Sequence, residues 1–233
     1  MNERIMRMAR KRGITRLCHF TPSRNLGHIL TDPRGILATK HLKSDDRAVL
    51  NPTDLQRLDG HPGHVCCSIQ YPNAWYFRKA RRDERLFLDW VVLLIKPHYL
   101  WTAGTKFCPF NAAGGYGRHL REGADAFDAL FADSTTDTQG RTYGRGPGHP
   151  SYLPTNEQAE VLVPDRIAKE DLLGFAVADG AQAKRELAAL RILDVPPPQI
   201  WVAPDFYRPD WLSTVLRSGR YPTETRYTGG EDD

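Results

Sequence analysis

The sequence of 233 residues lacks the features that define several large classes of protein. Its longest apolar run, Trp90 to Ile95, is far shorter than the ~18 residues that a membrane-spanning helix needs. The first residues, Met-Asn-Glu-Arg, contain no signal-peptide hydrophobic region, so we expect a cytoplasmic protein without a membrane partner. A GxSxG motif, a P-loop and a GxGxxG motif after a strand are absent, which disfavours serine hydrolases, P-loop NTPases and Rossmann dehydrogenases.

Cysteine is scarce, and its spacing disfavours the usual cysteine-based sites. The four cysteines are Cys18, Cys66, Cys67 and Cys108, and no two of them form a CxxC pair. An adjacent pair on a strand points its side chains to opposite faces. No set of His, Cys, Asp and Glu residues has zinc-like spacing either. We therefore expect reduced, mostly buried thiols and no metal.

The composition is ordinary for a globular protein, with 40% hydrophobic and 26% charged residues, and we predict one domain over residues 1–233. The formal net charge of +4 is modest, but basic residues cluster in an arm over residues 1–15 and again over residues 78–85. Trp75, Tyr76 and Phe77 precede the second cluster, and arginine beside aromatic rings suits phosphates and unstacked bases. The clusters therefore favour a single-stranded nucleic acid partner, with a solvated charged surface as the alternative.

Short strands and scattered helices alternate irregularly along the chain. Runs of branched and aromatic residues predict strands over 17–20, 36–39, 64–69, 87–95, 155–163, 174–177 and 200–203. Thr21 and Pro22 fit the N-cap and first residue of a helix that carries Leu26, Ile29 and Leu30 on one face. Asn51 opens a further turn, and other helices are predicted over 167–172, 181–193 and 211–216. Because regular strand–helix alternation appears only near the end, the pattern indicates an α+β fold.

Residues 109–155 are rich in glycine and polar residues and lack sustained apolar periodicity, apart from a helical turn predicted over 126–131. A loop of this length is uncommon in a compact domain unless it is functional or mobile. Because it ends just before Gln158 and Glu160, we predict a substrate-covering loop. Residues 227–233 are expected to form a frayed tail.

Three stretches carry polar residues where an apolar core pattern would not. They are Cys18-His19-Phe20-Thr21, Ser68-Ile69-Gln70-Tyr71-Pro72-Asn73 and Gln158-Ala159-Glu160. Side chains alternate along a strand, so His19 and Thr21 share one face, as do Gln158 and Glu160. Taken singly, each stretch has an ordinary explanation, either a satisfied core histidine or an edge strand with a solvated face.

Together with SRNLGHIL and Asn111-Ala112-Ala113, these stretches resemble the DarT family of NAD-dependent ADP-ribosyltransferases, toxins that modify nucleic-acid bases. The resemblance runs from about residue 16 to about residue 178, and QAEVLV is its strongest block. It implies an ADP-ribosyltransferase-like fold, with a central mixed or antiparallel split β-sheet and flanking helices. The segment around Asn73 departs from the thymidine-modifying pattern, which points to a guanosine-modifying branch and leaves guanine and thymine both open as targets.

The resemblance also implies roles for individual residues. Glu160 matches the catalytic glutamate, which would bind the ribose 2′-hydroxyl and stabilise an oxocarbenium-like transition state. Arg57 is the candidate to neutralise the pyrophosphate or position NAD, and Arg47 is the competing choice. The residues expected to bind NAD are His19, Phe20, Thr21, Asn25, Leu26, Arg47 and Tyr71.

The acceptor side is expected to involve Gln158 and the loop before it. The residues expected to bind the nucleic acid are Gln158, Asn73, Trp75, His119, Arg121 and Arg145, with Arg118, Arg141 and Tyr143 as further loop contacts. NAD is then a consumed co-substrate, single-stranded DNA the acceptor, and an antitoxin with ADP-ribosyl-glycohydrolase activity the expected partner. The alternatives are transfer to RNA by the same mechanism and a non-catalytic single-strand binding module. The RNA 2′-phosphotransferases, which also consume NAD, are disfavoured because their histidine-arginine pairs are absent.

Overall fold

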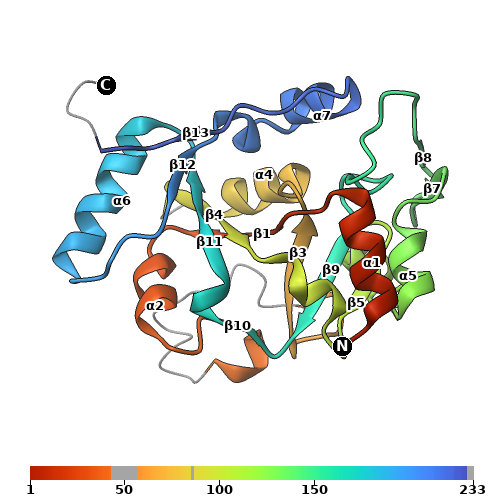
Figure 1. Ribbon diagram of the computed structural model, residues 1–233, viewed down its shortest axis with the longest axis horizontal. Helices are drawn as coiled ribbons and strands as arrows, with labels where there is room; N and C mark the ends of the chain where they lie inside the picture. Colours follow the sequence, from red (N-terminus) through yellow and green to blue (C-terminus); the bar gives the residue numbers. More distant parts are fainter. Residues whose placement is uncertain (43–56, 85–86, 230–233) are drawn as a thin grey trace.

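A computed structural model describes residues 1–42, 57–84 and 87–229, which form an α+β fold around a nine-stranded sheet (Figure 1). The helices are α1 (Glu3–Arg12), α2 (Asn25–Thr31), α4 (Ala74–Asp83), α5 (Ala124–Ala129), α6 (Gly180–Ile192) and α7 (Pro209–Arg217). Short 3-10 turns occur at η1 (Thr39–His41), η2 (Pro97–Trp101), η3 (Ala112–Gly115), η4 (Lys169–Asp171) and η5 (Pro204–Tyr207). Within the described residues, no helix is long and apolar enough to cross a membrane.

The large sheet has the strand order β13-β12-β11-β4-β1-β3-β9-β5-β6. Its strands are β1 (Leu17–Pro22), β3 (His64–Ile69), β4 (Trp90–Ile95), β5 (Lys106–Cys108), β6 (Arg121–Glu122), β9 (Glu160–Pro164), β11 (Leu172–Val177), β12 (Ile200–Val202) and β13 (Thr225–Arg226). Only β11 and β12 pair in parallel among these neighbours, so the sheet is mixed and mainly antiparallel. Two small sheets pair β2 (Ile36–Leu37) with β10 (Arg166–Ile167) and β7 (Ser134–Thr136) with β8 (Thr142–Gly144).

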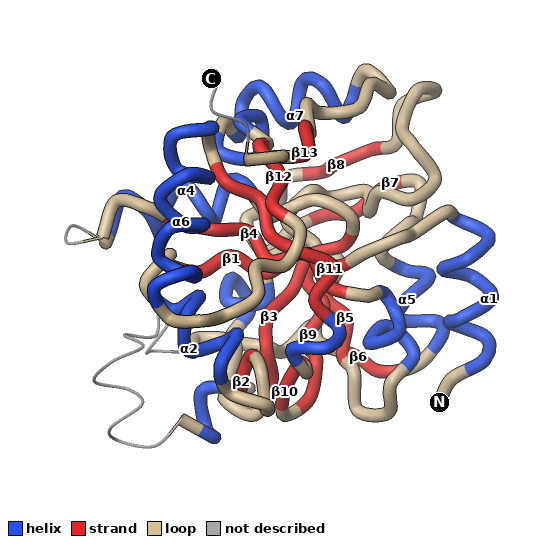
Figure 2. The backbone as a smooth tube through the Cα atoms, turned by 60° about the vertical axis from the view of Figure 1, so that its left-hand side comes forward, coloured by secondary structure: helices blue, strands red, loops and turns tan. Residues whose placement is uncertain are grey.

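The sheet splits between β1 and β3. Strand β1 pairs with β4 along its whole length, from Leu17 to Pro22. Its pairing with β3 covers only Leu17 with Ile69 and Cys18 with Ser68, so the two strands diverge beyond Cys18. Figure 2 shows α2, β2 and β10 at this end of the strands. The predicted split sheet is therefore present, and its opening is bordered by polar residues of β1.

The sheet is covered on both faces because its central strands are apolar on both sides. In β4, Val91, Leu93 and Ile95 belong to one buried cluster, while Trp90 and Val92 belong to the other. Helices α1, α2, α5 and α6 contribute residues to the first cluster, and α4 and α7 to the second. Burial on both faces explains why the sequence of β4 is continuously apolar instead of alternating.

The expected N-terminal basic arm is instead the docked helix α1. Asn2 caps its first turn by accepting a hydrogen bond from the backbone of Ile5, and Ile5 and Ala9 are buried against the sheet. Two of its arginines form ion pairs with α5, Arg4 with Asp125 and Arg12 with Asp128. The arm prediction was wrong because it weighed the charges and overlooked the apolar stripe between them.

Three further predictions about local structure were wrong. Thr21 and Pro22 end β1 instead of capping a helix, and α2 begins at Asn25. The helix predicted over 167–172 is replaced by the ends of β10 and β11 and the short turn η4. Tyr227 donates its backbone N–H to the carbonyl of Ile200, so the predicted tail is ordered at its start. The turn predicted at Asn51 lies outside the described residues.

Residues 109–155 are not a featureless loop. They contain η3, β6, α5 and the β7–β8 hairpin, and they bury Phe127, Leu130 and Phe131 in the main core. The apolar residues of α5 span little more than one helical turn, which is too short for periodicity to stand out in the sequence. The segment is therefore anchored to the sheet, and its position before β9 comes from this packing.

Candidate active site

A cavity of about 560 Å³ opens where β1 and β3 diverge. Its walls come from β1, α2, the segment that follows α2, β3 and the first turn of α4, and Glu160 lies at its edge. Seven of the predicted site residues line it: His19, Phe20, Thr21, Asn25, Arg57, Asn73 and Glu160. Residues that are far apart in the sequence are thus brought together by the split in the sheet.

Glu160 is the first residue of β9 and is half-buried. One carboxylate oxygen, Oε2, accepts a hydrogen bond from the backbone nitrogen of Ala112 at 3.2 Å. On the neighbouring strand, Cys108 lies opposite Glu160; burial and then the charge of Glu160 raise the pKa of this thiol to about 12. A protonated thiol is a poor nucleophile, so Cys108 is not activated for attack beside Glu160.

His19 presents a neutral imidazole to the cavity. Its Nδ1 atom lies 2.8 Å from the carbonyl oxygen of Cys66, and because a carbonyl only accepts, Nδ1 carries the hydrogen. Burial lowers the pKa of His19, and the bond to Cys66 only partly opposes this effect. Nε2 is therefore a hydrogen-bond acceptor at neutral pH, suited to an amide or hydroxyl group of a ligand.

Asn25 joins α2 to β1 and has an unused acceptor. Its Nδ2 atom donates to Thr21 Oγ1 at 2.8 Å. The residue is only 6% exposed, and its Oδ1 atom has no hydrogen-bond partner among the residues that the structure describes. A buried polar atom without a partner is costly unless a ligand or water satisfies it, so Oδ1 is a candidate acceptor for a donor group of a ligand.

Asn73 supplies the complementary feature, an unused donor. Its Oδ1 atom caps α4 by accepting a hydrogen bond from the backbone of Tyr76 at 3.1 Å. The cap fixes the orientation of the amide, because only the oxygen can accept this bond. The residue is 4% exposed, and its Nδ2 atom has no hydrogen-bond partner in residues 1–42, 57–84 and 87–229. The cavity therefore contains both an unsatisfied acceptor and an unsatisfied donor.

Arg57 lines the cavity, but its guanidinium is engaged within the protein. Its side chain is 9% exposed and forms a two-bond ion pair with Asp59, which is 4% exposed. The remaining hydrogens reach the carbonyls of His61 and His64 and the hydroxyl of Thr39. Although burial opposes ionisation of Asp59, the bonds from Arg57 and His61 hold its pKa below the usual value.

The predicted contact of Arg57 with the pyrophosphate would require some of these bonds to break, so the structure favours a bracing role. Asp59, its partner, was overlooked in the sequence, where the signal is an Arg-Leu-Asp run before a turn. The competing residue, Arg47, lies outside the described residues.

Leu26 and Tyr71 are expected NAD ligands that do not line this cavity. Leu26 is buried in the main core. Tyr71 packs with Phe206 and the guanidinium of Arg16 in the second core. Both residues are therefore part of the hydrophobic core.

Gln158 precedes β9 instead of lying on it. Asn156 forms a turn in which its Oδ1 atom accepts from the backbone of Gln158 and its carbonyl accepts from Ala159. The prediction that Gln158 and Glu160 share one face of a strand is therefore wrong. Trp75 lies close by and donates its Nε1 hydrogen to Glu157.

The three expected acceptor contacts in the 109–155 segment are held by their own segment. His119 packs edge-on against Phe110. Arg121 donates to the carbonyls of Arg118 and Leu120. Arg145 donates to the carbonyls of Leu153 and Pro150. These bonds shape the segment, and they occupy donors that the sequence analysis assigned to the acceptor strand.

Comparison with solved structures places the fold among the DarT ADP-ribosyltransferases. Thermosipho africanus DarTG in complex with ADP-ribose superposes with a TM-score of 0.56 at 12% identity, covering 83% of this chain and 51% of that chain. Thermus sp. 2.9 DarT in complex with ADP-ribosylated ssDNA gives 0.53 at 16% identity, covering 84% and 97%. The same enzyme in complex with NAD+ gives 0.52 at 15% identity, covering 83% and 97%. The chain thus spans about half the length of the Thermosipho chain and nearly all of the Thermus one.

Residues 18–208 match the family model described as ssDNA thymidine ADP-ribosyltransferase, DarT. The chain belongs to this family, which confirms the predicted fold class and the predicted class of NAD-dependent ssDNA ADP-ribosyltransferase toxins. A guanosine-modifying branch receives no support, since the matching model is that of the thymidine enzymes. No curated protein matches the chain.

Proposed function

We propose that this chain transfers ADP-ribose from NAD to thymidine in single-stranded DNA, with Glu160 as the catalytic residue. The observation that carries the proposal is the carboxylate of Glu160 at the edge of a cavity that also contains unsatisfied amide atoms of Asn25 and Asn73. Such a cavity can hold the uncharged polar groups of a ligand, for example the ribose hydroxyls and the amide of NAD.

The cavity residues divide into groups that accept and groups that donate hydrogen bonds. Nε2 of His19 and Oδ1 of Asn25 accept, which suits ribose hydroxyls and amide N–H groups. Nδ2 of Asn73 and the hydroxyl of Thr21 are donors toward carbonyl or hydroxyl oxygens. Held at several points, NAD would bind with its ribose next to Glu160.

The reaction follows from this arrangement. The bond between the ribose and nicotinamide breaks, and its electron pair leaves with nicotinamide. The carboxylate of Glu160 stabilises the positive charge that develops on the ribose and accepts a hydrogen bond from its 2′-hydroxyl. A thymine nitrogen then attacks the ribose carbon, and the proton of that nitrogen passes to Glu160 or to water.

The family and fold support two partner proposals. Single-stranded DNA is the acceptor, because a paired base does not expose its reactive edge. An antitoxin that removes ADP-ribose is the protein partner, as the DarTG name of the Thermosipho relative suggests for that protein.

The direct test incubates the protein with NAD and single-stranded oligonucleotides that contain thymidine or guanosine as the only candidate base. We expect nicotinamide release and the mass of one ADP-ribose on the thymidine oligonucleotide alone. Glu160→Gln should abolish transfer and retain DNA binding. Glu170 is exposed and does not line the cavity, so Glu170→Gln should leave transfer unchanged. Transfer to guanosine or to RNA would change the assigned acceptor, and no mass added to any oligonucleotide would overturn the transferase proposal.

A further inference from the structure

Helices α4 and α7 pack against each other in the upper part of Figure 1 and form an outer surface. We call it the α4–α7 surface; it comprises Trp75, Arg78, Arg208, Trp211 and Arg217. Glu157, three residues before Glu160, holds it in place by accepting hydrogen bonds from Trp75 at 3.3 Å, Ser213 at 2.8 Å and Arg217 at 2.9 Å. The surface is therefore fixed next to the segment that delivers the catalytic carboxylate.

The surface and the cavity also share a helix. Asn73, the N-cap of α4, and Tyr76 in its first turn both line the cavity. Trp75 and Arg78 lie on the same helix and face Glu157 and Asp210. Helix α4 thus leads from the cavity to the outer surface, so a strand with one nucleotide at Glu160 would reach this surface with its neighbours.

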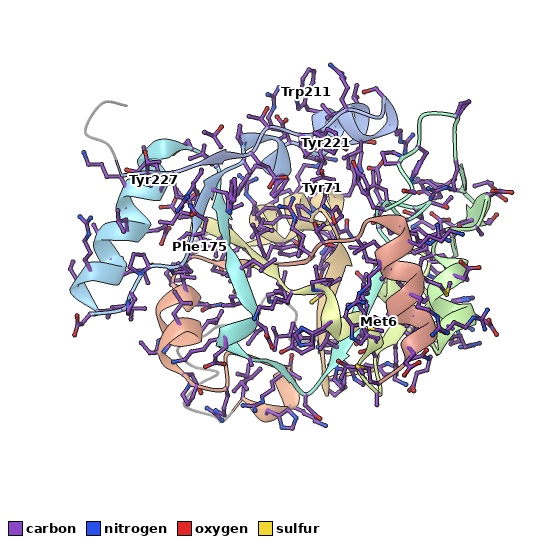
Figure 3. All side chains as sticks on the ribbon, in the orientation of Figure 1. Met6, Tyr71, Phe175, Trp211, Tyr221 and Tyr227 are labelled. Carbon is purple, nitrogen blue, oxygen red and sulfur yellow. The ribbon has the colours of Figure 1, made fainter. Side chains whose placement is uncertain are left out.

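The surface carries two arginine–aromatic pairs. The guanidinium of Arg78 lies 4.9 Å from the ring of Trp75, and that of Arg208 lies 5.6 Å from the ring of Trp211. Trp211 is 42% exposed and sits at the outer edge of the molecule (Figure 3). Aromatic rings with adjacent arginines form the stacking surfaces that single-stranded nucleic acids use.

The charge of the surface is complementary to a polyanion. The exposed charged residues of α4, α7 and the N-cap of α7 comprise five basic ones, Arg78, Lys79, Arg82, Arg208 and Arg217, and two acidic ones, Asp83 and Asp210. Arg208 makes no ion pair with any residue that the structure describes. An unpaired arginine beside an exposed tryptophan suits one nucleotide, with its phosphate on the guanidinium and its base on the indole.

We propose that the α4–α7 surface binds the unpaired nucleotides that flank the modified base, with Trp211 and Arg208 as the outermost contact. This inference rests on the proposed function, because the flanking nucleotides are defined by the base that lies at Glu160. A paired duplex would hide the base faces that Trp211 needs, so the surface adds a preference for single strands.

The experiment compares Arg208→Ala/Trp211→Ala with the wild-type chain on oligonucleotides of about four and about twenty nucleotides, each with one thymidine. We expect the variant to raise the KM for the long oligonucleotide roughly tenfold, with kcat and the KM for the short one unchanged. The plot of log affinity against log salt concentration should also become less steep. Its slope should change by about 0.7, because one charge is lost. Arg191→Ala/Ile192→Ala, which removes one exposed charge and one exposed apolar side chain from α6, is the matched control.

Binding of the long oligonucleotide without NAD, measured by fluorescence anisotropy, separates the two proposals. If no oligonucleotide is modified but the variant still loses affinity, the transferase proposal fails and the surface assignment stands. If transfer occurs and the variant matches the wild type in both affinity and KM, the surface assignment is wrong and a protein partner becomes its better occupant. An equal loss on short and long oligonucleotides would also overturn it, because the effect would then come from the cavity.

Discussion

The Oε2 atom of Glu160 lies 3.2 Å from the backbone nitrogen of Ala112, so the first residue of β9 is joined to the first residue of η3. The first N–H groups of a helix have no partner within it, and this one is available to a carboxylate. A hydrogen bond to a charged group is stronger than one between neutral groups, and it fixes the direction of the side chain. The backbone of the 109–155 segment therefore orients the carboxylate that we propose to be catalytic.

Replacing Ala112 with proline tests this contact, because proline lacks the N–H group and is favoured at the first position of a helix. Asn111 already has the extended conformation that a residue before proline requires, with φ −62° and ψ 118°. We expect kcat for transfer to fall roughly tenfold to a hundredfold. Ala112→Gly, which keeps the N–H group, is the control, and thermal unfolding of both variants checks the fold. An unchanged kcat in a folded proline variant would refute the orienting role.

Asn73 offers a variant that separates the cap of α4 from the unused donor. Asn73→Asp keeps the shape and the Oδ1 acceptor for Tyr76 but loses the Nδ2 hydrogens, and Asn73→Ser also keeps a capping oxygen. We expect the serine variant to retain the melting temperature and the aspartate variant to lose part of it, because its carboxylate would be buried. In both variants kcat/KM for transfer should fall at least about tenfold, because a bound oxygen loses its donor. Asn73→Ala should in addition lose about 1 kcal/mol of unfolding free energy. Full activity in the serine and aspartate variants would mean that Nδ2 contacts no substrate.

His19 makes stability depend on pH. Burial lowers its pKa in the folded state, so the folded protein binds fewer protons than the unfolded chain between that lowered pKa and the ordinary value of about 6.5. Its contribution is therefore fully present above about pH 6.5 and is lost as the pH falls toward the lowered value. Burial lowers the pKa of His64 and His149 as well, so urea unfolding should compare the wild type with His19→Gln from pH 7.5 to 5. The variant should show the shallower decline, and equal slopes would contradict the assignment.

Arg57 should matter more for folding than for phosphate binding. Arg57→Ala leaves the buried carboxylate of Asp59 without its partner, and breaking a buried pair in this way costs about 3–5 kcal/mol. Urea unfolding should detect a loss of this size, and Asp59→Asn should also destabilise the chain. The exposed pair of Arg78 with Asp210 is the control, since its removal should cost less than about 1 kcal/mol. A folded, fully stable Arg57→Ala chain with a raised KM for NAD would instead restore the phosphate-binding role.

The local sequence was sufficient to predict an element where one kind of interaction dominates its folding. The apolar runs gave β3 with its observed bounds and the core of β4, because strands buried on both faces have few alternatives. Prediction from the local sequence failed where a few side-chain hydrogen bonds decide the backbone conformation. The turn made by Asn156 starts β9 at Glu160, and Thr21 and Pro22 extend β1 instead of capping α2.

By itself, the sequence determined the enzyme family, the residues of the QAEVLV block and the strands β1, β3, β4, β9, β11 and β12, since these depend on apolar runs and on motif order. It missed the strands β5, β6 and β13. Only the tertiary structure decided which polar atoms are still available to a ligand. The donors of Arg57 are taken by residues brought to it by folding, whereas atoms of Asn25 and Asn73 remain unsatisfied at the same cavity. Hydrogen-bond partners are set by distances in space, and a sequence records only distances along the chain.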